Sequence, residues 1–98
     1  MKYLVTYEHR HGTDQTLCRT ANAAYICAMD IILTWIEELD ESDQKVIREL
    51  IQAKDYEKAL EQWEEIQGER LNGETIGIQE IGFFDARKGA KRIKELLA

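Results

Sequence analysis

The spacing of the apolar residues changes twice along this chain, and that change constrains the fold more than any other feature. Residues 3–8 alternate, with Tyr3, Val5 and Tyr7 on one face, as in a half-buried β-strand. From about residue 23 to residue 69 the apolar positions recur at helical spacing. Residues 75–84 are again rich in Ile and Phe. This order of patterns indicates a domain built from both a sheet and helices.

The pattern predicts seven elements: strands at 3–8 and 15–20, helices at 23–39, 43–53 and 56–69, a strand at 75–84, and a final basic amphipathic turn or helix. Residues 9–14 form a polar connection between the first two strands, longer than the tightest hairpin turns. Thr20 or Asn22 is expected to cap the first helix. A change of phase near Glu80 indicates either a bulge or a strand buried on both faces.

Three strands do not form a stable sheet without a packing partner, so the helices must cover one face. We therefore expect an α+β fold with the order ββαααβα. Its three-stranded, mainly antiparallel sheet is covered on one face by three helices. The chain has no proline and no low-complexity linker, which predicts a single compact domain over residues 1–98.

The first predicted helix has a wide apolar stripe and is expected to be the centre of the core. The stripe consists of Tyr25, Ala28, Met29, Ile32, Trp35, Ile36 and Leu39. Two cysteines, Cys18 and Cys27, are too few for a disulfide framework, and both have apolar neighbours. We interpret them as small buried side chains of a reduced, cytoplasmic protein. The chain enters its first strand without the apolar region of a signal peptide, and no apolar run is long enough to span a membrane.

The charges are distributed unevenly, and this is the strongest functional signal in the sequence. Residues 37–69 hold twelve acidic and four basic residues, a local charge of −8 in a chain whose total is −6. The last fourteen residues hold five basic and two acidic residues, a charge of +3. Glu57–Glu61 and Glu61–Glu65 are like-charge pairs at i,i+4, which lower helix stability. A helix selected only for stability would carry lysines among them, so a binding face is a hypothesis beside that of a solvated face.

The predicted partner-binding residues are all acidic: Glu37, Glu38, Asp40, Glu41, Asp43, Glu57, Glu61, Glu64 and Glu65. We expect a non-enzymatic domain, without cofactor or metal, that binds a basic surface of another protein. An acidic face competes for the Lys and Arg groups that hold phosphates, so the partner is expected to belong to a nucleic-acid-handling complex. Small acidic phage proteins that block restriction or CRISPR complexes are analogous in size and charge. The pI of about 4.9 argues against direct nucleic-acid binding by the basic tail, which could also dock on the acidic helices.

Two alternatives remain open from the sequence. One is a homodimeric structural or regulatory domain that pairs through edge strands or through the Trp-bearing helices. The other is a small metal-dependent enzyme that uses His9, His11 and Asp14, since imidazole and carboxylate groups suit zinc and related metals. No third strong ligand is in register with the two histidines, and a polar hairpin tip with Asp14 in a turn explains the same residues.

Overall fold

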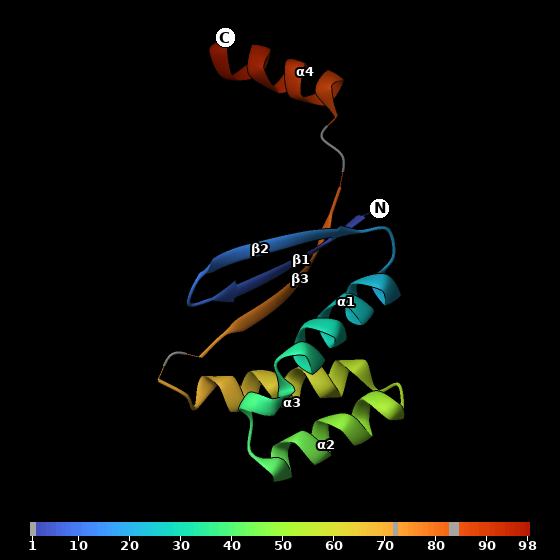
Figure 1. Cartoon of the computed structure of the whole chain (residues 1–98). Helices are drawn as coiled ribbons and strands as arrows, with labels where there is room; N and C mark the ends of the chain where they lie inside the picture. Colours follow the sequence, from blue (N-terminus) through green and yellow to red (C-terminus); the bar gives the residue numbers. More distant parts are fainter. Residues whose placement is uncertain (1, 72, 83–84) are drawn as a thin grey trace.

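The computed structural model describes residues 2–71, 73–82 and 85–98, and its elements follow the predicted order ββαααβα (Figure 1). They are β1 (Lys2–His9), β2 (Gly12–Cys18), α1 (Ala21–Thr34), the 3₁₀ helix η1 (Ile36–Glu38), α2 (Glu41–Gln52), α3 (Tyr56–Gly68), β3 (Thr75–Ile81) and α4 (Ala86–Leu97). The predicted α+β class is confirmed.

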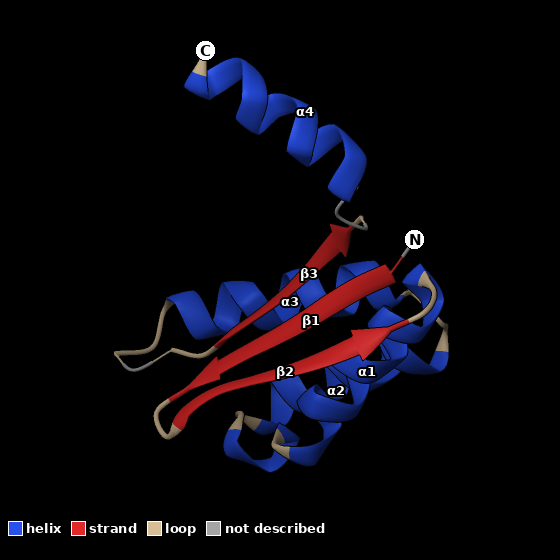
Figure 2. Ribbon diagram, turned by 90° about the horizontal axis from the view of Figure 1, so that it is seen from above, coloured by secondary structure: helices blue, strands red, loops and turns tan. Residues whose placement is uncertain are grey.

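The three strands form one antiparallel sheet in the order β2-β1-β3. Helices α1, α2 and α3 lie on one side of this sheet, and the other face is open (Figure 2). The β1–β3 register runs without interruption from Lys2↔Ile81 to Glu8↔Thr75. Both alternatives predicted for the phase change near Glu80 are therefore wrong for β3. Each residue of this strand has one partner on β1, so there is no bulge, and Thr75, Gly77 and Gln79 are exposed, so the strand is not buried on both faces. The predicted continuation of the strand through residues 83–84 lies outside the described residues.

The β1–β2 turn consists of Arg10 and His11 alone, so the longer connection predicted over residues 9–14 is wrong. His9 pairs with Gly12, whose φ of +135° lies in the region that favours glycine. Because Gly12 adopts this conformation, the strands continue up to the turn. Asp14 consequently lies inside β2, opposite Tyr7, instead of in a turn.

The core lies between the sheet and the helices. Its most deeply buried large side chains are Val5 of β1, Ile32 of α1 and Ile47 of α2. Helix α3 contributes Ala59, Leu60 and Trp63, while Ile76 of β3 and Cys18 of β2 complete the sheet side. The backbone break at Lys54, with φ of 59°, separates α2 from α3 as predicted and lets the two helices pack side by side (Figure 1).

Helix α1 begins two residues before the predicted start and ends five residues before the predicted end. Thr20 is the cap, since its Oγ1 accepts the N–H of Ala23 at 3.0 Å. The helix ends at Thr34, and η1 forms one further turn that buries Ile36. This break turns Trp35 away from the apolar stripe and leaves it 50% exposed. The prediction that Trp35 belongs to the core is therefore wrong.

Helix α4 stands apart from the sheet and from the other helices (Figures 1 and 2). Asp85 caps it by accepting the N–H groups of Arg87 and Lys88, and none of its residues is buried. The radius of gyration is 17.7 Å, whereas a compact chain of this length has about 13 Å. The difference reflects the projecting helix.

Candidate functional site

Eight of the nine predicted partner-binding acids are exposed, and Asp43 is half-buried. They lie on three elements of the helical layer. Glu37 and Glu38 belong to η1, Asp40, Glu41 and Asp43 to the start of α2, and Glu57, Glu61, Glu64 and Glu65 to α3. The structure thus divides the predicted face into two groups with different surroundings.

The first group, the α3 stripe, consists of Glu57, Glu61, Glu64 and Glu65. Helix α3 turns its apolar residues toward the core, so these four exposed carboxylates point to solvent. The ion pair that the structure shows on this helix joins Lys58 to Asp55 at 3.8 Å and involves none of the four. Within the described residues no cation lies within 4 Å of the stripe, so its like charges are not compensated by ion pairs.

The second group, the η1–α2 cluster, consists of Glu37, Glu38, Asp40, Glu41 and Asp43. Three of its members line a depression with Glu69 and Arg70 from the end of α3. The guanidinium of Arg70 lies 3.5 Å from the carbonyl oxygen of Glu38. In addition, acids in the first turn of α2 interact favourably with the helix dipole. Glu57 also lies in the first turn of its helix, but Glu61, Glu64 and Glu65 of the α3 stripe lack such a structural explanation.

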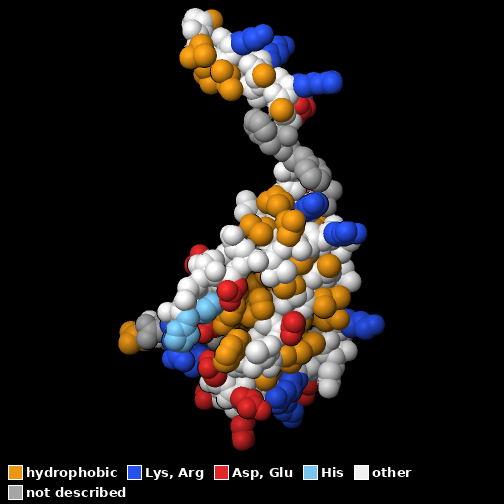
Figure 3. All heavy atoms as spheres, turned by 45° about the horizontal axis from the view of Figure 1, so that its top comes forward, with side chains coloured by type: hydrophobic (Ala, Val, Ile, Leu, Met, Phe, Trp, Pro, Cys, Tyr) orange, Lys and Arg blue, Asp and Glu red, His pale blue; other side chains and the backbone are white. Residues whose placement is uncertain are grey.

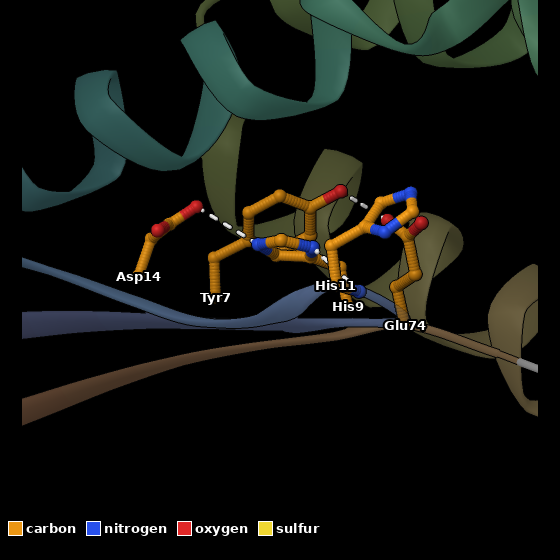
Figure 4. A network of polar contacts seen from close by, with 5 residues as sticks. All are labelled: Tyr7, His9, His11, Asp14 and Glu74. Carbon is orange, nitrogen blue, oxygen red and sulfur yellow. Dashed lines mark hydrogen bonds and ion pairs between the residues drawn. The ribbon is translucent and has the colours of Figure 1, made fainter.

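A polar network that the sequence did not predict joins the hairpin end to the α3–β3 connection (Figure 4). The Tyr7 hydroxyl donates to the Glu74 carboxylate. Gln67, buried near the end of α3, accepts the backbone N–H of Glu74 at 3.1 Å. Tyr7 and Glu74 are 67 positions apart, so no local pattern could have paired them.

His9 belongs to the same region, and both of its ring nitrogens have partners (Figure 4). Its Nε2 lies 2.9 Å from Oδ2 of Asp14, and its Nδ1 accepts the backbone N–H of His11 at 3.2 Å. Nδ1 therefore carries no proton in this geometry, and Nε2–H donates to Asp14. Among the residues that the structure describes, no group of three or more His, Cys, Asp or Glu side chains is placed to hold a metal ion.

Two groups, Tyr7 in this region and Cys27 in α1, have a raised pKa. Burial, and then the hydrogen bond and charge of Glu74, raise the pKa of Tyr7 well above its usual value. Burial likewise raises the pKa of the Cys27 thiol, which disfavours a thiolate nucleophile. Tyr7 acts here as a hydrogen-bond donor that fastens β1 to the segment before β3.

Comparison with known proteins gives no relative from which to infer a function. No family model, no curated protein and no solved structure matches this chain. In the described part of the chain, none of the helices combines the length and the apolar content needed to cross a bilayer. The geometry of the described residues is therefore the basis for any function inferred for this chain.

Proposed function

We propose that this chain is a non-enzymatic acidic domain that binds a basic surface on another protein. The α3 stripe carries this proposal. Four exposed carboxylates follow one side of a single helix, and no cation of the described residues pairs with them. Each like-charge pair at i,i+4 costs the helix roughly 0.2–0.5 kcal/mol, which one interleaved lysine would recover.

The charge of the surrounding molecule supports the same proposal. Since the whole chain carries −6 and residues 85–98 carry +3, residues 1–84 carry −9. A field of this sign accelerates encounter with a basic partner and disfavours acidic ones. In its finer form, the proposal is that the chain inhibits or modulates a nucleic-acid-handling complex, because Lys and Arg groups that bind phosphates also bind carboxylates.

The test compares two double variants with the same change in net charge. Glu57→Lys with Glu61→Lys reverses the centre of the α3 stripe, and Glu49→Lys with Glu80→Lys reverses two exposed acids elsewhere. Immobilised wild-type chain first captures a partner from lysate for identification by mass spectrometry. The affinity of that purified partner is then measured for the wild type and both variants at low and high salt.

We expect the stripe variant to bind at least about tenfold more weakly than the control variant, with a shallower salt dependence. An equal loss of affinity in the two variants would show that only net charge matters. It would contradict specific binding by the α3 stripe. Duplex DNA serves as a competitor for the finer proposal. If DNA bound to the partner does not displace the chain, the partner surface is not one that holds phosphates.

A further inference from the structure

Helix α4 has the two faces of a docking helix but no surface beneath it. Ala90, Ile93, Leu96 and Leu97 share one side, and five basic residues occupy the other (Figure 3). The side chains of Ile93, Leu96 and Leu97 are 57%, 66% and 82% exposed. A helix of twelve residues is marginally stable in water by itself, because most helical stability comes from packing an apolar face. Helix α4 therefore needs an apolar surface.

Helix α1 has more apolar residues than a helix with one exposed side normally carries. Asp30 is the only charged residue among its fourteen. A helix that is apolar all round is expected to be covered on every side. Yet Ile26 and Leu33, two turns apart on the same side, are 50% and 42% exposed. The exposed side of α1 thus presents two large apolar side chains, with the exposed Asp30 between them.

The charges around these two surfaces are complementary. Between residues 21 and 44, which include α1, there are six acidic residues and no basic one. The polar side of α4 carries Arg87, Lys88, Lys91, Arg92 and Lys94. The lengths also agree, since twelve and fourteen residues of helix measure about 18 and 21 Å. The charges around Leu71, another exposed apolar side chain, are mixed, because it lines a depression with Glu38 and Glu74 but also with Arg10 and Arg70.

The connection to α4 disfavours docking on the α1 of the same chain. The five steps from Ile81 to Ala86 span at most about 18 Å when fully extended. Helix α1 already lies one layer away from β3, on the covered face of the sheet (Figure 2). If α4 packed on the outer side of α1, its distance from β3 would be the sum of two steps. The step from the sheet to α1 is about 10 Å and the step from α1 to α4 is about 8–10 Å, roughly 20 Å in all. A second copy is not limited by this connection.

We propose that α4 of one copy packs along the exposed side of α1 of a second copy, and that the exchange is reciprocal. One helix contact of this size is small beside the roughly 1,200 Å² that a specific interface buries. Two equivalent contacts related by a two-fold axis bring the interface toward that area. The result is a symmetric dimer held by apolar contact and by opposite charges. It does not depend on the proposed partner, because none of its residues belongs to the α3 stripe.

The test measures the mass of the full chain over a range of concentrations by analytical ultracentrifugation. The α4 variant combines Ile93→Asp with Leu96→Asp, and the α1 variant combines Ile26→Asp with Leu33→Asp. The control variant combines Leu17→Asp with Leu71→Asp, which are 53% and 99% exposed. All three variants exchange two exposed apolar side chains for two acids, so their net charges are identical. Circular dichroism checks that each retains its fold.

We expect a dimer for the wild type and the control variant. The dissociation constant of the α4 variant and of the α1 variant should each rise at least tenfold. A wild type that is monomeric at every concentration would overturn the proposal. So would a dimer that survives the α4 variant, or one that is lost in the α4 variant but kept in the α1 variant. A monomer that binds vesicles of anionic lipid through α4 would assign the apolar face to a lipid surface instead.

Discussion

At the scale of single residues, the contact between Tyr7 and Glu74 shows where sequence patterns stop being informative. Alternation along β1 correctly placed Tyr7 on the buried face. Its hydroxyl nevertheless needs a partner, because a buried donor without one costs free energy. That partner comes from the far end of the sequence, beside β3. Periodicity determines which way a side chain points, but only the packed fold brings in its hydrogen-bond acceptor.

This contact predicts a stability that depends on alkaline pH. Tyr7→Phe should lower the free energy of unfolding by about 1–3 kcal/mol near neutral pH, since it removes a hydrogen bond to a charged group. The raised pKa of Tyr7 means that the folded state favours the protonated hydroxyl. The stabilisation is therefore complete below about pH 10, the value of the unfolded chain, and declines above it. Urea unfolding at neutral pH and above pH 10 measures this change.

The other tyrosines titrate in both proteins, so the difference between wild type and Tyr7→Phe isolates this residue. That difference should shrink as the pH rises above 10. If it stays constant or grows, the Tyr7 hydroxyl is not held in its protonated form by the fold.

The exposure of Trp35 predicts that its replacement by alanine affects stability less than the replacement of the smaller but buried Ile32. Ile32 is fully buried, so Ile32→Ala should destabilise the protein by roughly 2–5 kcal/mol. Trp35 is 50% exposed, so its side chain packs against the protein over only part of its surface. Trp35→Ala should therefore lower the free energy of unfolding less than Ile32→Ala, although it removes more atoms. Urea melts of the two variants decide the order. A larger loss for Trp35→Ala would mean that its ring is packed on the core.

At the scale of helices and strands, residue spacing predicted which elements form better than it predicted where they end. The three strands, the helical hairpin of α2 and α3 and the final amphipathic helix are present as expected. The end of α1 was missed because the apolar spacing continues through Leu39 in the sequence. In the structure Ile36 and Leu39 are buried by a separate turn, η1. The apolar residues of α1 and of this turn together have the spacing of one longer helix. The exposed acids of α3 were predicted because amphipathic spacing alone determines that face.

The start of α1 offers a test of capping, since the sequence allowed either Thr20 or Asn22. Thr20→Ala removes the hydrogen bond to the N–H of Ala23 and should cost about 1 kcal/mol. Asn22 lies inside the exposed first turn of the helix. Asn22→Ala should be neutral or slightly stabilising, because alanine has the higher helix propensity. A greater loss for Asn22→Ala in thermal or urea unfolding would move the cap to Asn22.

At the scale of the whole molecule, the change in the sign of the charge falls at the point where the projecting helix α4 begins. The part of the chain before residue 85 carries −9, and the projecting α4 with its cap carries +3. The sequence showed this division of charge, but it could not show that α4 would stand apart, because amphipathic spacing predicts an apolar face without saying what covers it. The acidic part is the proposed partner-binding unit, and α4 is the proposed link between two copies.

This division predicts that α4 can be broken without weakening the rest of the chain. Lys91 is exposed in the middle of α4, so Lys91→Pro interrupts the helix at a cost of about 3 kcal/mol while keeping its apolar residues. Lys91→Ala is the matched control, because it removes the same charge and preserves the helix. The dissociation constant of the dimer should rise on the order of a hundredfold in Lys91→Pro and stay within a few-fold in Lys91→Ala. In urea unfolding at concentrations where the chain is monomeric, both variants should match the wild type within about 0.5 kcal/mol. A loss of 1 kcal/mol or more confined to Lys91→Pro in the monomer would show that α4 packs against its own chain, and the exchange between copies would then be wrong.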